Sequence, residues 1–111
     1  MGKPIKNFIY LSDAEFPGGD EAWTEYLSQN LNARVPIKNK APLGTYHVVV
    51  RFIVGTDGKI SFIEPETNLG YGMEEEAMRV VRKSPKWNPL IFIGQLKPAY
   101  RRQPITFVVA E

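Results

Sequence analysis

The feature that most constrains the fold is a strict alternation of side chains between Thr45 and Val54. One set is entirely apolar or aromatic and comprises Tyr46, Val48, Val50, Phe52 and Val54. The intervening set mixes polar and apolar residues and comprises Thr45, His47, Val49, Arg51 and Ile53. Because successive side chains of a strand point to opposite faces, this pattern predicts a strand with one face on a core and the other only partly covered.

The alternation ends at Gly55-Thr56-Asp57-Gly58, a sequence typical of a hairpin turn because Asp-Gly adopts positive φ at little cost. We therefore predict a return strand over about Lys59 to Glu64, stopped near Pro65. A second, smaller hairpin is predicted around Gly94-Gln95. Residues 33–44 contain two prolines and a glycine and are predicted to form a loop.

Two helices are predicted, one on each side of the first hairpin. After the breakers Phe16-Pro17-Gly18-Gly19, acidic Asp20 and Glu21 favour a helix start. Trp23, Leu27 and Leu31 then recur on one face, and the helix fades near Asn30-Leu31-Asn32. The second helix begins near Glu74, has Arg79, Arg82 and Lys83 in its last turn, and is stopped by Ser84-Pro85. Its apolar face comprises Met73, Ala77, Val80 and Val81.

A final strand is predicted from Ile105 to Ala110, opened by Pro104, and Phe8 to Leu11 is a candidate edge strand. This order of elements predicts an α+β fold, an antiparallel three- to four-stranded sheet with two helices packed on one face. With 111 residues we expect a single domain over residues 8–111, preceded by residues 1–7 as a remnant of a vector or linker.

The composition excludes several kinds of chemistry. The chain has no cysteine and only one histidine, His47, so disulfides, thiolate metal sites and multi-histidine metal sites are excluded. The longest uninterrupted apolar run, Leu90 to Ile93, is far shorter than a membrane span. We expect no catalytic residue, no metal ligand and no cofactor, and therefore no enzyme.

Four motifs favour structural interpretations over chemical ones. His47 lies mid-strand with no carboxylate or serine in register to make it a base. Glu64 and Glu66 have the spacing of a paired acid and base, but Pro65 interrupts them. Glu74 to Glu76 fill a first helical turn, and Gly70-Tyr71-Gly72 lacks the third glycine or the lysine of a phosphate-binding loop.

Charge is distributed unevenly along the chain. Between Ala77 and Ala110 there are seven basic residues and no acidic one, although the net charge is only +2. Trp87, Phe92 and Tyr100 interleave with the bases of residues 79–102, a composition found on nucleic-acid-binding surfaces. We treat nucleic-acid binding as the alternative function and favour a protein partner, because Arg79, Arg82 and Lys83 already complement the end of a helix.

The last predicted strand is the most suggestive feature. Pro104 has no N–H to donate, which favours the edge of a sheet. A terminal apolar edge strand either accepts another extended chain or is covered by the protein itself. The predicted partner-binding residues are Arg101, Arg102, Pro104, Ile105, Thr106, Phe107, Val108 and Val109.

The order of motifs resembles the C-terminal domain of TonB energy transducers, in the form common in Bacteroidetes-type bacteria. In the first half the matching motifs are Phe16-Pro17-Gly18-Gly19, Trp23-Thr24-Glu25-Tyr26-Leu27, Gly44, and Asp57-Gly58-Lys59-Ile60. In the second half they are Gly70-Tyr71-Gly72-Met73-Glu74-Glu75-Glu76-Ala77, Pro85-Lys86-Trp87, Pro89, and residues Ala99 to Phe107. The resemblance covers residues 8–110.

The resemblance implies a periplasmic binding module. Such domains follow a membrane anchor, which couples to a proton-driven motor complex of the inner membrane, and a proline-rich linker; neither is in these 111 residues. They grip an extended segment of an outer-membrane transporter, the TonB box, which adds as a strand beside the last strand. We therefore expect a transporter peptide, and not nucleic acid, at residues 104–110, with pairing between edge strands of two copies as a route to a homodimer.

The chain departs from the family pattern in two places. Transducers carry Tyr-Pro just after the first helix, whereas this chain has Arg34-Val35-Pro36, so contacts of that tyrosine do not carry over. The late hairpin is usually polar, whereas Leu90 to Ile93 are all apolar. These four residues are expected either to pack under Phe8 to Leu11 or to form an exposed patch for a partner.

Overall fold

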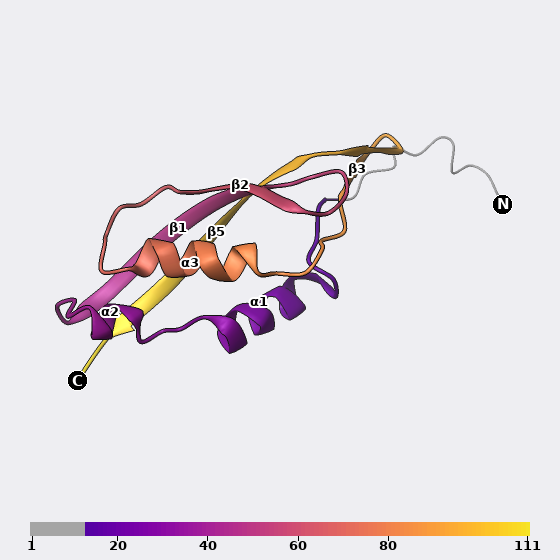
Figure 1. The fold of residues 1–111 in the computed structure, drawn as a ribbon. Coiled ribbons are helices and arrows are strands. Elements are labelled where there is room, and N and C mark those ends of the chain that lie inside the picture. Colours follow the sequence, from indigo (N-terminus) through magenta and orange to yellow (C-terminus); the bar gives the residue numbers. More distant parts are fainter. Residues whose placement is uncertain (1–12) are drawn as a thin grey trace.

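The computed structural model describes residues 13–111, so the predicted strand Phe8 to Leu11 lies outside the described residues. Its elements are α1 (Gly19–Asn30), α2 (Val35–Lys38), β1 (Gly44–Val54), β2 (Ile60–Pro65), α3 (Met73–Arg82), β3 (Leu90–Phe92), β4 (Gln95–Lys97) and β5 (Ala99–Val109) (Figure 1). None of the helices within residues 13–111 has the length and hydropathy of a membrane-spanning segment.

The strands form a three-stranded antiparallel sheet and a separate two-stranded hairpin. In the larger sheet the order is β2-β1-β5, so β1 is central and β5 lies at one edge. The ladder between β1 and β5 runs without interruption from the pair Gly44 and Val109 to the pair Val54 and Ala99. Among the described strands, β3 and β4 pair with each other alone and form the predicted small hairpin.

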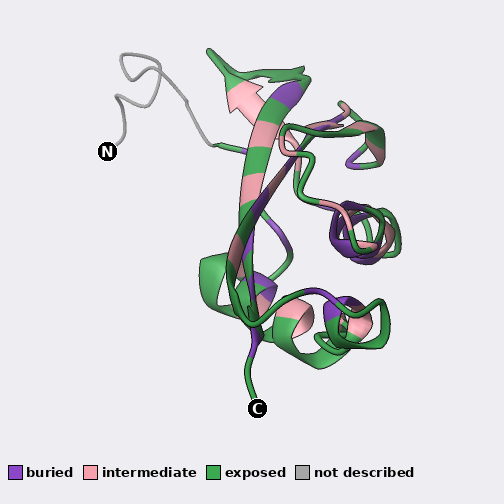
Figure 2. Ribbon diagram, turned by 90° about the vertical axis from the view of Figure 1, so that its left-hand side faces the viewer, coloured by how far each residue is buried: buried purple, intermediate pink, exposed green. Residues whose placement is uncertain are grey.

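The period of two in β1 separates a buried face from an outer face. Val48, Val50, Phe52 and Val54 are at most 1% exposed and pack with the apolar residues of α3 and with Trp23 of α1 in one core. On β5, exposed and buried or half-buried residues alternate in the same way (Figure 2). The helices therefore cover one face of the sheet, and α3 lies in front of β1 and β5 in Figure 1. This confirms the predicted α+β fold.

The start of α3 is stabilised by its own acidic residues. The carboxylate of Glu74 accepts hydrogen bonds from the N–H groups of Leu69 and Gly70 at 2.8 and 3.0 Å, and from the Thr67 hydroxyl at 2.9 Å. The glycines of Gly70-Tyr71-Gly72 have positive φ, as a turn into a helix requires. Glu74 therefore occupies the position that an anion would take at this loop. This agrees with the prediction that Gly70-Tyr71-Gly72 is a turn into a helix and not a phosphate-binding loop.

The turn between β1 and β2 docks against the segment that follows α3. Gly58 is buried at φ +82, and its carbonyl accepts the N–H of Trp87 at 2.9 Å. A Cβ atom at this position would overlap the carbonyl oxygen of Trp87. The glycine of the predicted Asp-Gly turn is thus required both by its backbone conformation and by close contact with a neighbouring segment.

The structure corrects two predicted boundaries. Residues 33–44 are not entirely loop, because Val35–Lys38 form one helical turn in which Pro36 occupies an early position that needs no N–H. The last strand begins at Ala99, five residues before the predicted opening at Pro104. Pro104 lies within this strand, opposite Val49. It is tolerated there because its nitrogen faces the edge of the sheet and not β1, so the ladder needs no N–H from it.

Candidate functional site: the free edge of β5

The edge strand β5 exposes backbone groups that no other strand of residues 13–111 satisfies. Val49 turns both of its backbone groups toward β2: its carbonyl accepts the N–H of Glu66 at 2.8 Å, and its N–H donates to the Thr67 hydroxyl at 3.2 Å. Val49 is therefore not hydrogen-bonded to Pro104, although the two lie directly opposite each other. The nitrogen and carbonyl of Pro104 consequently face the free edge of the sheet.

Pairs along an antiparallel ladder alternate between those that exchange hydrogen bonds and those that do not. The even-numbered residues of β5 therefore all direct their backbone groups outward, namely Tyr100, Arg102, Pro104, Thr106 and Val108. Each of these except Pro104 offers one N–H and one C=O. Within residues 13–111, β5 has no strand neighbour other than β1, so this row of groups is available to an added strand.

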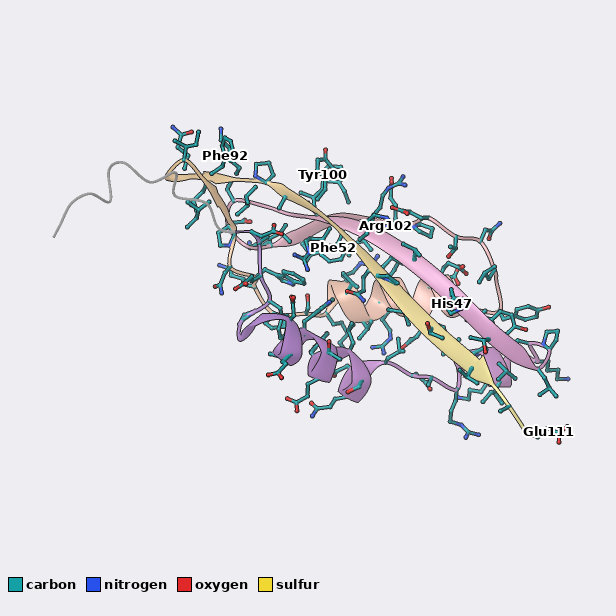
Figure 3. The ribbon with its side chains drawn as sticks, turned by 180° about the vertical axis from the view of Figure 1, so that it is seen from behind. His47, Phe52, Phe92, Tyr100, Arg102 and Glu111 are labelled. Atoms are coloured by element: carbon teal, nitrogen blue, oxygen red, sulfur yellow. The ribbon has the colours of Figure 1, made fainter. Side chains whose placement is uncertain are left out.

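The side chains of the same residues lie on the outer face of the sheet, where Tyr100 is 82% and Val108 is 57% exposed. Figure 3 shows the sheet in front of α3, with Tyr100 projecting away from α1. The alternate residues Ile105, Phe107 and Val109 are buried against the core. The predicted site residues 104–109 thus divide into outward-facing edge residues and residues that anchor the strand to the domain.

Pro104 and Gln103 together interrupt the edge. The amide oxygen of Gln103 accepts the indole N–H of Trp23 at 2.6 Å, which identifies the other end of the amide as its nitrogen. That nitrogen donates to the carbonyl of Pro104 at 2.7 Å. Pro104 therefore lacks a donor, and its carbonyl already has a partner. The edge is divided into one segment at Tyr100 and Arg102 and another at Thr106 and Val108.

The two predicted arginines have different environments. Arg102 is exposed on the outer face and forms an ion pair with Glu66 at 2.8 Å, two strands away. Arg101 points to the helix side, where its guanidinium lies 5.4 Å from the centre of the Trp87 ring and donates to the carbonyl of Ala14 at 3.0 Å. Arg101 therefore supports the fold beneath the edge, a role that only the tertiary structure reveals.

The two glutamates considered as an acid and base are both ion-paired. Glu64 contacts Arg51 at 2.7 Å, directly across the β1–β2 ladder. The hydrogen bond from Arg102 holds the pKa of Glu66 below its ordinary value, with burial opposing this and the charges of Arg102 and Arg51 reinforcing it. A catalytic acid needs a raised pKa, so the lowered pKa of Glu66 does not suit that role. Both glutamates are instead engaged in surface ion pairs.

The outer face of the sheet also carries His47 and a depression. His47 Nδ1 lies 3.1 Å from Thr106 Oγ1, a cross-strand contact in a closely spaced pair. A depression of about 420 Å³ is lined by Arg51, Phe52, Ile53, Phe62, Glu64 and Tyr100. These side chains include no serine, cysteine or histidine, and no metal-binding group of acids or histidines is found within residues 13–111.

The basic residues of 79–102 do not form one surface. Arg79 donates to Glu76 and to the carbonyl of Asn30, Arg101 lies over Trp87, and Arg102 pairs with Glu66. Arg82 and Lys86 instead line a separate depression beside the β1–β2 turn, together with Lys59. The stretch is thus continuous in sequence but divided in space.

The apolar residues 90–93 differ in their exposure. Leu90 and Ile91 are half-buried, whereas Phe92 and Ile93 at the hairpin tip are 47% and 59% exposed. Leu90 packs against the main core.

Comparison of the chain with models of protein families, with curated proteins and with solved structures finds no match. The geometry of the β5 edge and the motifs of the sequence are therefore what indicate a function.

Proposed function

We propose that this domain is the periplasmic binding module of a TonB-like energy transducer. It captures the extended TonB-box segment of an outer-membrane transporter by strand addition to the free edge of β5. The observation that carries the proposal is the outward-facing row of backbone groups at Thr106 and Val108, in an edge strand whose one neighbour among residues 13–111 is β1, on its other side. The ordered motifs of the sequence support the same assignment.

Strand addition suits a module that must accept several partners. The hydrogen bonds are made to the main chain of the peptide, so they tolerate different side chains, and selectivity comes from contacts at alternate positions. Beside Thr106 and Val108 those contacts lie on the outer face, where β-branched and apolar side chains pair favourably across strands. No acid–base or metal chemistry is needed for this task.

The same geometry suits the transmission of force. A peptide bound to β5 and pulled along its length loads its hydrogen bonds in shear, so that all of them resist together. The load passes to β1 through a ladder that spans the eleven residues of β5. In this proposal an N-terminal anchor would connect the domain to the inner-membrane motor complex.

The proposal is tested with a matched pair of proline variants. Thr106→Pro removes an N–H that faces the free edge, whereas Thr45→Pro, at the opposing residue of β1, removes an N–H that faces away from β5. Titration of each variant with a synthetic TonB-box peptide should show at least a 10-fold weaker affinity for Thr106→Pro and little change for Thr45→Pro. Equal affinity of both variants and the unaltered domain would contradict strand addition at this edge.

A further inference from the structure

We propose that Pro104 and Gln103 form a stop that fixes where an extended peptide pairs with β5, so that the peptide is bound by the Thr106–Val108 segment alone. This inference rests on the proposed function and specifies the register of the bound peptide. It makes Pro104 a specificity-determining residue that acts through its backbone.

Residue 104 lacks the hydrogen-bonding capacity that a passing peptide strand needs. A peptide strand that continued from Thr106 past Pro104 would need a donor from residue 104 for one of its carbonyls. Proline has no N–H, and the carbonyl of Pro104 is already bonded to the Gln103 amide at 2.7 Å. A passing peptide would therefore leave one carbonyl without a protein donor and would compete with Gln103 for an acceptor.

The stop formed by Gln103 and Pro104 is held rigidly by the core. Gln103 cannot easily release Pro104, because its amide oxygen is held by the Trp23 indole N–H at 2.6 Å. Trp23 is only 4% exposed and stacks with Tyr26 at 5.6 Å, so its position is fixed by the core. The chain Trp23–Gln103–Pro104 thus connects the edge of the sheet to the centre of α1.

Tyr100 and Arg102 form the segment of the β5 edge that precedes the stop. Tyr100 and Arg102 also offer outward backbone groups, but Arg102 bonds to Glu66 through its side chain and both residues follow directly from the short hairpin β3–β4. A peptide that crossed the stop would have to bridge both segments. The downstream segment is continuous to the end of β5 at Val109, so the peptide is expected there.

Amide hydrogen exchange of the unaltered domain, saturated with a synthetic TonB-box peptide, tests the stop directly. The amides of Thr106 and Val108 should become at least 10-fold more protected, and those of Tyr100 and Arg102 should not change. Protection of all four amides would show that the ladder passes Pro104 and would overturn the inference while leaving strand addition intact. Saturable binding that protects none of the four would overturn strand addition itself.

The variant Pro104→Val provides a second measurement. It restores an outward-facing donor without disturbing the β1 ladder, because residue 104 does not bond to β1. Peptides extended past the stop should gain roughly 2- to 10-fold in affinity for this variant, as one added hydrogen bond allows, and nothing for the unaltered domain. The same gain on Pro98→Val, a proline outside β5, would overturn the assignment to Pro104. Equal affinity of long and short peptides for Pro104→Val would overturn it as well.

Discussion

The indole N–H of Trp23 donates to the amide oxygen of Gln103 at 2.6 Å, joining α1 to the edge strand β5 across 80 residues of sequence. This single bond positions the Gln103 amide nitrogen on the carbonyl of Pro104. The edge at which a partner strand would add is therefore organised from the hydrophobic core, and changes in the core should be detectable at the edge.

A double-mutant cycle on Trp23→Phe and Gln103→Leu should measure this coupling. Phenylalanine keeps an aromatic ring beside Phe16 and Tyr26 but loses the indole N–H. We expect a coupling free energy of about 1 kcal/mol in urea unfolding, the usual net value of one hydrogen bond. Additive effects of the two substitutions would contradict a direct bond between these side chains.

Gly58→Ala should be strongly destabilising. A methyl group at residue 58 would overlap the Trp87 carbonyl oxygen, and the backbone there has φ +82. We expect a loss of about 2–4 kcal/mol in the free energy of unfolding. Gly94→Ala is the matched control, because Gly94 has φ +73 but no atom within 4 Å of the added methyl group. Gly94→Ala should cost about 1 kcal/mol; similar losses at both positions would argue against the Trp87 contact.

Glu76 should contribute stability that depends on pH. Its side chain is 7% exposed, accepts the Asn32 N–H at 2.7 Å and pairs with Arg79 at 2.7 Å. Burial of Glu76 acts to raise its pKa, but the hydrogen bonds and charge of these partners outweigh burial and lower the pKa below its usual value. Glu76→Gln should therefore cost about 1–3 kcal/mol at neutral pH, whereas the exposed Glu75→Gln should change stability by less than about 0.5 kcal/mol.

The sign of the pH effect follows from the lowered pKa. The contribution of Glu76 is fully present above the pKa of an unfolded glutamate, about 4.3, and is lost as pH falls through the lower folded-state value. The difference in unfolding free energy between the unaltered domain and Glu76→Gln should be constant above about pH 5 and shrink in more acidic solution. A difference that grows toward low pH would contradict the ion pair.

Binding to nucleic acid should be weak and only slightly dependent on salt. Arg79, Arg101 and Arg102 are already engaged within the domain, which reduces the number of bases of residues 79–102 that can neutralise phosphates together from seven to four. We expect no retention on heparin at physiological salt. Retention with a steep salt dependence would instead support the nucleic-acid alternative.

Most of the regular elements could be predicted from the sequence because each of these has a local signal, whereas the single turn of α2 lies in a segment predicted to be a loop. The alternation from Tyr46 to Val54 predicted β1 and its buried face, and the charges at both ends of α3 predicted its limits within about two residues. The start of β5 could not be predicted in this way. A proline normally opens a strand or breaks it, and only the pairing with Val49 shows that residue 104 needs no N–H toward β1.

The candidate site could be predicted only in part. The preference of Pro104 for an edge and the mainly apolar character of residues 105–109 pointed to a strand that the structure does place at an edge of the sheet. The roles of Gln103, Arg101 and Glu76 depend on partners 80, 87 and 44 residues away in sequence, and no local pattern indicates such contacts. A polar residue adjacent to an edge proline is the one signal that could have directed attention to Gln103.

The absence of cysteine from the chain permits the most direct test of the central claim, strand addition at the β5 edge. Val108→Cys would be mixed with TonB-box peptides that carry one cysteine at successive positions, under mild oxidation. Because only directly opposite residues on neighbouring strands bring their Cβ atoms close enough, disulfides should form chiefly at one peptide position, the one that pairs with residue 108. The control Phe62→Cys, exposed on β2 at the far side of the sheet, should form none above background. Equal cross-linking at Val108→Cys and Phe62→Cys, or no dependence on peptide position, would contradict the account.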